Sequence, residues 1–197
     1  MPATLYLCRH GDTPWSTERR FAGKTDLPLT ADGEESARLL GNRLRTLQLQ
    51  FDLILASPLL RARQTAELAG FPARIDDRLM ELGFGDYEGR TRAEILRERP
   101  GWTYIRDGNP NGESVAHVGA RIDALLPDLR GQVLIFAHAV VLRVLTARWL
   151  GQPPRFAEHL SLAPASLSIL HHDPVDDAPA IALWNDRSHL SNAPSFA

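Results

Sequence analysis

Arginine and histidine side chains follow three short apolar stretches that lie far apart in the sequence. They are Arg9 and His10 at the end of residues 3–9, Arg61 and Arg63 after residues 51–56, and His138 after residues 132–137. An arginine side chain presents a planar fork of N–H donors to two oxygens and keeps its charge at neutral pH. Guanidinium and imidazole groups gathered in one pocket therefore suit a phosphoryl group. The sequence indicates a phosphate site, provided that these three segments meet in the fold.

The three apolar stretches are predicted to be buried strands, and a helical pattern follows the second and third directly and the first after a loop. Strands that alternate with helices predict an α/β fold with a doubly wound sheet. Ligands of such sheets bind beyond the carboxyl ends of the parallel strands. We therefore expect Arg9, His10 and His138 on one rim of the sheet, with Gly11 allowing the chain to leave the extended conformation after His10.

N-caps and apolar periodicity predict the remaining elements. We expect helices over 30–47, 59–69, 91–99, 114–129 and 140–150, with Thr30, Thr91 and Ser114 as N-caps. Further short strands are predicted over 73–75, 165–170 and 180–184. Residues 12–29 and 102–112 have no sustained period and are predicted to be loops. A loop longer than about 12–15 residues is often a binding loop.

The composition is that of an ordinary globular protein. Of the 197 residues, 44% are hydrophobic and 23% are charged, and the formal net charge is −2. We expect one domain over residues 1–197 with no general attraction for nucleic acid or for an anionic membrane. No apolar run approaches the length of a membrane span, and the segment after Met1 lacks the basic and apolar regions of a signal peptide. We therefore expect a cytoplasmic protein.

Other phosphate and metal chemistries are disfavoured. The sequence has no Walker-type glycine loop, and its one cysteine, Cys8, lies in a predicted buried strand, which argues against a cysteine phosphatase. A metal site needs three or four ligands of defined geometry. His171, His172 and Asp173 are adjacent, but side chains arranged in this way are more often surface residues. We expect neither a metal nor a cofactor.

Four motifs occur in the order typical of a known family, over Leu5 to about Leu150. They are Arg9-His10-Gly11-Asp12-Thr13 with Phe21, Gly23, Asp26 and Pro28-Leu29-Thr30; Ser57-Pro58-Leu59 with Arg61-Ala62 and Gln64-Thr65-Ala66; Glu81 with Phe84-Gly85 and Glu88-Gly89; and Ala137-His138. This set resembles the signature of the histidine phosphatase superfamily, which includes the cofactor-dependent phosphoglycerate mutases. The resemblance implies a phosphoglycerate mutase-like fold, a three-layer α/β/α sandwich around a mostly parallel mixed sheet.

The resemblance also implies roles for the motif residues. His10 is expected to be the nucleophile that forms a phosphohistidine. Glu81 is expected to protonate the leaving oxygen and later to activate water. Arg9, Arg61 and His138 are expected to hold the charged oxygens of the phosphoryl group. The implied substrate-binding residues are Arg9, Ser16, Gly23, Arg61, His138 and Ala139, whereas Arg63 is expected on the helix surface.

Two of these positions depart from the family pattern. Ser16 stands where asparagine is usual, and its shorter hydroxyl reaches a phosphate less well. Ala139 follows His138 where glycine is usual, and alanine is tolerated there if the residue is helical. Neither change removes a charge from the expected pocket.

The sequence favours a phosphomonoesterase of the compact phosphatase branch. The interval between Glu81 and His138 lacks the long insertion of the mutases, and Gly112-Glu113-Ser114 within it is similar to a segment of compact phosphatases. The arginines of this interval are expected to form a solvated face; they are Arg92, Arg97, Arg99 and Arg106. The alternatives are a cofactor-dependent phosphoglycerate mutase and a catalytically weak phosphate-binding relative.

The expected partner is a small phosphomonoester. Its identity depends on loops whose shape the sequence does not give, and these loops surround Trp15, Phe21, Phe84, Tyr87 and Trp102. The oligomeric state is open, with a homodimer as one option.

Overall fold

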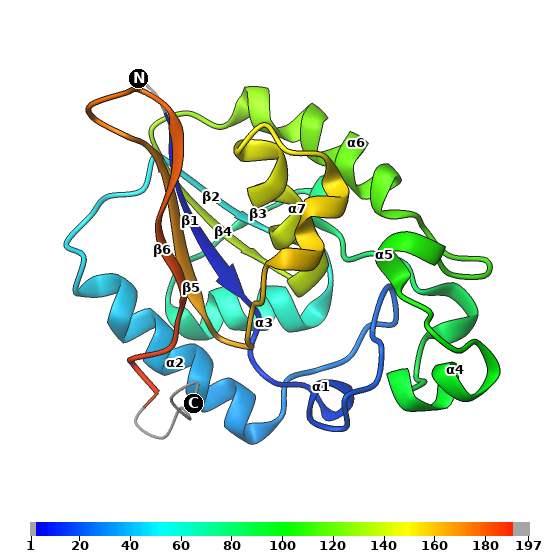
Figure 1. The fold of residues 1–197 in the computed structure, drawn as a ribbon. Helices are drawn as coiled ribbons and strands as arrows, with labels where there is room; N and C mark the ends of the chain where they lie inside the picture. Colours follow the sequence, from blue (N-terminus) through cyan, green and yellow to red (C-terminus); the bar gives the residue numbers. More distant parts are fainter. Residues whose placement is uncertain (1–2, 191–197) are drawn as a thin grey trace.

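A computed structural model describes residues 3–190, whose strands form one six-stranded sheet (Figure 1). The strands are β1 (Thr4–Arg9), β2 (Leu53–Ala56), β3 (Arg74–Ile75), β4 (Gln132–Ala137), β5 (Leu167–His172) and β6 (Pro179–Asp186), in the spatial order β3-β2-β4-β1-β5-β6. Neighbours from β3 to β1 are parallel, whereas β5 pairs antiparallel with both β1 and β6. The prediction of a mostly parallel mixed sheet is confirmed.

Helices cover both faces of this sheet. They are α1 (Pro14–Thr17), α2 (Ala31–Arg45), α3 (Leu60–Ala69), α4 (Arg92–Glu98), α5 (Tyr104–Asp107), α6 (Val115–Leu125) and α7 (Ala139–Trp149), with short 3-10 turns at Asp77–Leu79, Gly85–Tyr87, Leu126–Asp128 and Pro154–His159. α2 and α3 pack on one face, and α6 and α7 on the other (Figure 1). The three-layer α/β/α sandwich is therefore confirmed.

The central strands are apolar on both sides because each side meets a layer of helices. In β1, Leu5 and Leu7 belong to the core shared with α6 and α7, while Tyr6 and Cys8 belong to the core shared with α2 and α3. Side chains alternate between the two faces along a strand, so burial on both faces requires an uninterrupted apolar run. Within residues 3–190, no helix has the length and apolar character needed to span a membrane.

The parallel register brings the ends of three strands to one place. Arg9 pairs with Ala137 across β1 and β4, and the next residue, His10, donates its backbone N–H to the Ala137 carbonyl at 3.0 Å. On the other side of β4, the Ser57 N–H donates to the Phe136 carbonyl at 3.0 Å. The residues that leave β1, β2 and β4 are therefore neighbours on the carboxyl rim of the sheet.

Two short helices lie where the sequence predicted only loops. α1 and α5 each begin after a threonine, Thr13 or Thr103, whose side chain accepts a hydrogen bond from a backbone N–H three residues later. A helix of four residues is too short to show apolar periodicity. The loop predictions over 12–29 and 102–112 are wrong at these positions. The N-caps predicted at Thr30, Thr91 and Ser114 are confirmed.

The last two strands extend beyond their predicted ends. β5 and β6 finish at His172 and Asp186, because they form an antiparallel ladder that continues past the apolar residues on which the prediction was based. Met1 and Pro2, which enter the prediction that no signal peptide is present, lie outside the described residues, as do residues 191–197.

Candidate active site

Gly11 turns the chain away from β1 at a very close approach to helix α2. A Cβ atom on Gly11 would lie 2.4 Å from the Gly33 carbonyl oxygen, so any larger residue collides with the backbone. The Gly11 N–H donates to the Thr65 hydroxyl at 3.1 Å, which ties this turn to α3. The sequence correctly marked Gly11 as special, but the reason is close packing and not a left-handed conformation, since its φ is not positive.

His10 is a buried, neutral imidazole with one ring nitrogen committed to the backbone. Its Nδ1 lies 2.7 Å from the Gly11 carbonyl oxygen, which can only accept, so Nδ1 carries the proton and Nε2 keeps its lone pair. Burial lowers the pKa of His10 well below its usual value of 6.5, and the charges of Arg61 and Arg9 lower it further. The ring is therefore neutral at neutral pH, with Nε2 free of a proton, as a nucleophile must be.

His138 lies directly beside His10, with the ring centroids 5.1 Å apart. Arg61 Nε donates to His138 Nδ1 at 3.2 Å, so the proton of His138 is on Nε2, which donates to the Ser57 hydroxyl at 2.7 Å. Burial, followed by the charge of Arg61, holds the pKa of His138 well below its usual range. Both ring nitrogens thus have protein partners, and the expected role of His138 in holding phosphoryl oxygens stays a prediction.

Arg61 is buried, with 1% of its surface exposed, and its side chain donates hydrogen bonds to the loop over 22–25. Its terminal nitrogens donate to the carbonyl groups of Ala22 at 3.2 Å, Gly23 at 2.8 Å and Thr25 at 3.0 Å. Burial lowers the pKa of Arg61 below its usual value. The guanidinium therefore joins His138 to the loop over 22–25, and direct contact with a phosphoryl group stays a prediction. Arg63 is exposed, as predicted.

Arg9 combines a partly exposed side chain with a hydrogen-bond donor that has no partner. One terminal nitrogen donates to the Leu162 carbonyl, whereas the buried Nε donates to no group within residues 3–190. Burial lowers the pKa of Arg9 to about 10, so the side chain remains a cation at neutral pH. A buried N–H without a partner, on a side chain that is a cation, is suited to an incoming anion.

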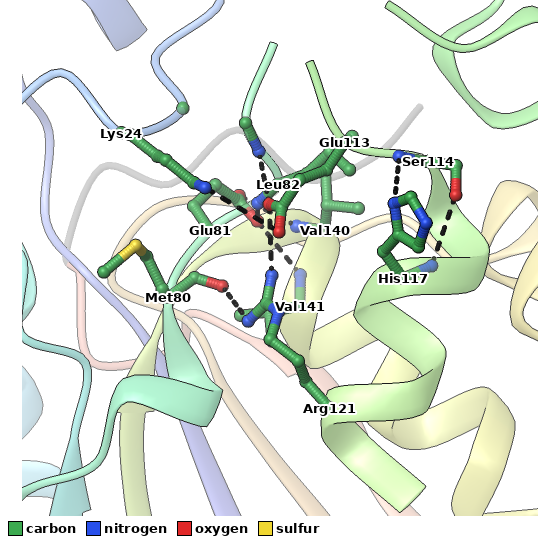
Figure 2. A network of polar contacts seen from close by, with 12 residues as sticks. Lys24, Met80, Glu81, Leu82, Glu113, Ser114, His117, Arg121, Val140 and Val141 are labelled. Atoms are coloured by element: carbon green, nitrogen blue, oxygen red, sulfur yellow. Dashed lines mark hydrogen bonds and ion pairs between the residues drawn. The ribbon is translucent and has the colours of Figure 1, made fainter. Parts of the chain in front are cut away.

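Glu81 is held at the N-terminus of α7 by backbone N–H groups. Its carboxylate accepts from Val140 at 3.0 Å, from Val141 at 3.1 Å and from the adjacent Leu82 at 2.9 Å (Figure 2). The N-cap residue of α7, His138, supplies no side-chain cap, so Glu81 caps this helix from a distant segment. The N-terminal end of a helix favours a negative charge. The same contacts fix the carboxylate relative to His138 and His10.

The segment that carries Glu81 is itself anchored by α6. Arg121 donates to the carbonyl groups of Arg78 at 2.9 Å and Met80 at 2.8 Å. Arg121 also pairs with Glu113 at 3.4 Å, and Glu113 accepts the Gly83 N–H at 2.9 Å (Figure 2). Backbone groups on both sides of Glu81 are therefore tied to one ion pair.

A cavity of about 230 Å³, which we call the catalytic cavity, opens beside His10. Of the predicted site residues, Arg9, His10, Ser16, Glu81 and Ala139 line it, whereas Gly23, Arg61 and His138 do not. Its wall contains four arginines, which are Arg9, Arg19, Arg20 and Arg143, and the single carboxylate of Glu81. This excess of cations around a neutral imidazole suits a phosphate dianion.

Ser16, the first departure from the family pattern, takes part in local contacts. Its hydroxyl donates to Asp12 Oδ1 at 2.9 Å and accepts the Thr13 N–H at 2.8 Å. Ala139, the second departure, is the first residue of α7, so its helical conformation needs no glycine.

No role was predicted from the sequence for several supporting residues, although Ser57 and Glu88 belong to the motifs named above. Ser57 follows strand β2 directly, and its position beyond a strand end was a usable signal. Glu88 accepts the backbone N–H groups of Lys24 and Thr25 at 2.8 and 2.9 Å, which fixes the loop that Arg61 clamps. Arg143 lies between the apolar residues 140–142 and 144–145, and a charge there could have been singled out. Tyr104 has no such signal, because only the fold brings it to the cavity.

Two further features lie apart from these residues. A larger cavity of about 560 Å³ is formed by α3 and the segment up to β3, and none of the predicted site residues lines it.

Among the described residues, no three histidine, cysteine, aspartate or glutamate side chains lie close enough to bind a metal ion.

Acidification is expected to destabilise the fold through the two buried imidazoles. Their pKa values are depressed in the folded protein, so below pH 6.5 the unfolded chain binds more protons and the free energy of unfolding decreases as the pH is lowered. From pH 6.5 to 5.5, each imidazole should cost about 1 kcal/mol. Denaturant titrations of the native protein and of His10→Gln measure this, and the pH dependence of the variant should be smaller by the contribution of His10, about 1 kcal/mol. Equal pH dependence in both proteins would contradict the assignment.

The sequence and the fold resemble those of known phosphatases and mutases. The model of the histidine phosphatase superfamily (branch 1) matches residues 5–187. A probable phosphoglycerate mutase GpmB of Enterobacter sp. (strain 638) is 35% identical over 213 aligned positions, which cover 98% of this chain and 96% of the relative. An acid phosphatase of Mycobacterium tuberculosis is 36% identical, with 84% of each chain covered.

A solved structure of a related protein has a similar fold. The open reading frame Rv3214 from Mycobacterium tuberculosis superposes with a TM-score of 0.86 at 32% identity, covering 93% of this chain and 97% of that one. Its sheet and helical layers therefore agree with those described above.

Proposed function

Because the chain belongs to branch 1 of the histidine phosphatase superfamily, a family of phosphoryl-transfer enzymes, we propose that it is a phosphomonoesterase that forms a phosphohistidine on His10. The observation that carries the proposal is the tautomer of His10. Its Nδ1–H donates to the Gly11 carbonyl, so Nε2 is left with a lone pair beside a cation-rich cavity. The proposed substrate is a small phosphorylated metabolite.

In the first step, His10 Nε2 attacks phosphorus, a P–N bond forms and the bond to the leaving oxygen breaks. Glu81 donates a proton to that oxygen, and the alcohol departs. In the second step, Glu81 takes a proton from water, whose oxygen attacks phosphorus and displaces Nε2. The products are free phosphate and regenerated imidazole.

Arg9 provides fixed positive charge throughout both steps. Its unmatched Nε–H and its place on the cavity wall support contact with the phosphoryl oxygens. Arginine stays charged when the oxygens gain charge in the transition state, so the attraction increases as the reaction proceeds. Arg61 and His138 are buried, and their nitrogens already contact protein groups. We propose that they contact the same oxygens once the carbonyl contacts of Arg61 and the contact of His138 with Ser57 are exchanged for the substrate.

The likeness to a probable phosphoglycerate mutase supports a second candidate, a cofactor-dependent mutase. A mutase returns the phosphoryl group from the histidine to a second hydroxyl of the sugar acid, whereas a phosphatase transfers it to water. A catalytically weak phosphate-binding relative would do neither. One domain over residues 1–197, a cytoplasmic location and the open oligomeric state stay predictions.

Incubation with 3-phosphoglycerate labelled with ³²P, alongside a panel of phosphorylated metabolites, separates these activities. We expect free phosphate to be released from at least one ester and no label to appear in 2-phosphoglycerate. Movement of label to the 2-position without matching release of phosphate would establish the mutase. Binding of substrate with neither outcome would leave the phosphate-binding relative.

A further inference from the structure

A second cavity lies against the catalytic cavity and shares part of its wall. This space of about 240 Å³, which we call the aromatic cavity, is bordered by Trp102 and Ile105 together with Phe21, Tyr104 and Arg143. The last three side chains also line the catalytic cavity. A molecule with its phosphoryl group beside His10 could therefore extend into the aromatic cavity past these three side chains.

The rings that border the aromatic cavity form a packed cluster. The Phe21 ring lies edge to face with Trp102 at 5.5 Å and with Tyr104 at 6.2 Å between centroids. Trp102 Nε1 donates to the Gly108 carbonyl at 2.8 Å, so the one polar atom of the indole already has its partner. The cluster thus presents carbon surface to the cavity, and its geometry is fixed by contacts among its own members.

Tyr104 and Arg143 line both cavities, and their polar groups bind one another. The Arg143 guanidinium donates to the Tyr104 hydroxyl at 2.6 Å and to the Ala157 carbonyl. The polar end of Tyr104 is therefore engaged at the junction with Arg143, while its ring belongs to the aromatic cluster. A substrate that crosses this junction would pass from a charged environment into an apolar one.

The charges around the two cavities differ. The cations gather around the catalytic cavity, with Glu81 as the only carboxylate among its lining residues. The aromatic cavity adds one exposed residue of each sign, Arg92 and Glu158, to the shared Arg143. It therefore gains no net charge of its own for a second anion. Its volume exceeds the roughly 150 Å³ of an apolar cavity known to hold benzene.

We propose that the aromatic cavity is a leaving-group subsite, and that the preferred substrates are phosphomonoesters whose alcohol carries an uncharged aryl or alkyl group. This assignment rests on the proposed phosphomonoesterase activity and names its substrate class. Burial of a group the size of a phenyl ring in such a cavity is expected to raise kcat/KM about 10- to 100-fold.

The test compares 2-phenylethyl phosphate with ethyl phosphate, whose leaving alcohols have similar acidity. The native protein should prefer the phenylethyl ester about 10- to 100-fold in kcat/KM. Ile105 borders only the aromatic cavity, so Ile105→Trp should fill that space and abolish most of the preference while the rate with ethyl phosphate stays unchanged. Ile105→Asn, which keeps the side chain small but polar, should reduce the preference as well.

Ile75→Trp serves as the matched control, because Ile75 is an exposed isoleucine on the edge strand β3 and borders neither the catalytic cavity nor the aromatic cavity. This variant should keep the full preference. Equal kcat/KM for the two esters in the native protein, or a preference that survives both changes at Ile105, would overturn the subsite alone. Absence of hydrolysis of every phosphomonoester tried would overturn the proposed function and the subsite together.

Discussion

Replacement of His10 by alanine is expected to lower kcat by at least about 10⁴-fold while the fold is retained. The variant loses the atom that attacks phosphorus, and the residues that line the catalytic cavity include no other histidine and no cysteine. Arg9, Glu81 and the other cavity residues remain in place, so substrate affinity should change far less than kcat. Initial rates of phosphate release over a range of ester concentrations measure both quantities.

The control for this variant is His171→Ala, which removes an imidazole from β5, where the side chain lines none of the three cavities described above. Its kcat should equal that of the native protein. Circular dichroism and thermal unfolding should show that both variants fold. Residual hydrolysis by His10→Ala within about 100-fold of the native rate would show that another group is the nucleophile.

Glu81→Gln is expected to slow esters according to the quality of their leaving group. The amide cannot donate the proton of a carboxylic acid, so an alkyl phosphate, whose alkoxide needs protonation, should lose about 10²- to 10⁴-fold in kcat. A 4-nitrophenyl phosphate, whose leaving group departs as the anion, should lose far less. Parallel measurement of kcat with both esters tests this.

A structural disturbance is the competing explanation for any loss in Glu81→Gln, because the carboxylate also accepts three backbone N–H groups. Glu113→Gln provides the matched control. It removes the charge of another carboxylate that accepts a backbone N–H, from Gly83, and that helps to anchor the segment carrying Glu81. The control should affect both esters equally. An equal loss on both esters in Glu81→Gln as well would move the general acid to another residue.

The parts of the fold that the sequence predicted correctly depend on local patterns. The β1 and β4 segments are apolar on both faces, so their burial in a central sheet follows from composition alone. Threonine and serine N-caps mark the starts of α2, α4 and α6 for a similar reason, since one side chain satisfies one backbone N–H nearby. The parallel sheet then places Arg9, His10 and His138 on the same rim.

The parts that it could not predict depend on contacts between distant segments. The hydrogen bonds from Arg61 to carbonyl groups of the loop over 22–25 could not be predicted from the sequence, because every residue has a backbone carbonyl group that could accept them. The pairing of Tyr104 with Arg143 likewise follows only from the packing of α5 against the segment after α7. The short helices α1 and α5 were missed because four residues carry no period.

Rapid-quench labelling of the protein with a ³²P phosphomonoester tests the central claim most directly. We expect label to appear on His10 at least as fast as turnover, to be stable in alkali and labile in acid, to decay with release of phosphate, and to be absent from His10→Ala. Hydrolysis without any labelled protein, or label that survives acid or persists in His10→Ala, would contradict a phosphohistidine at this position.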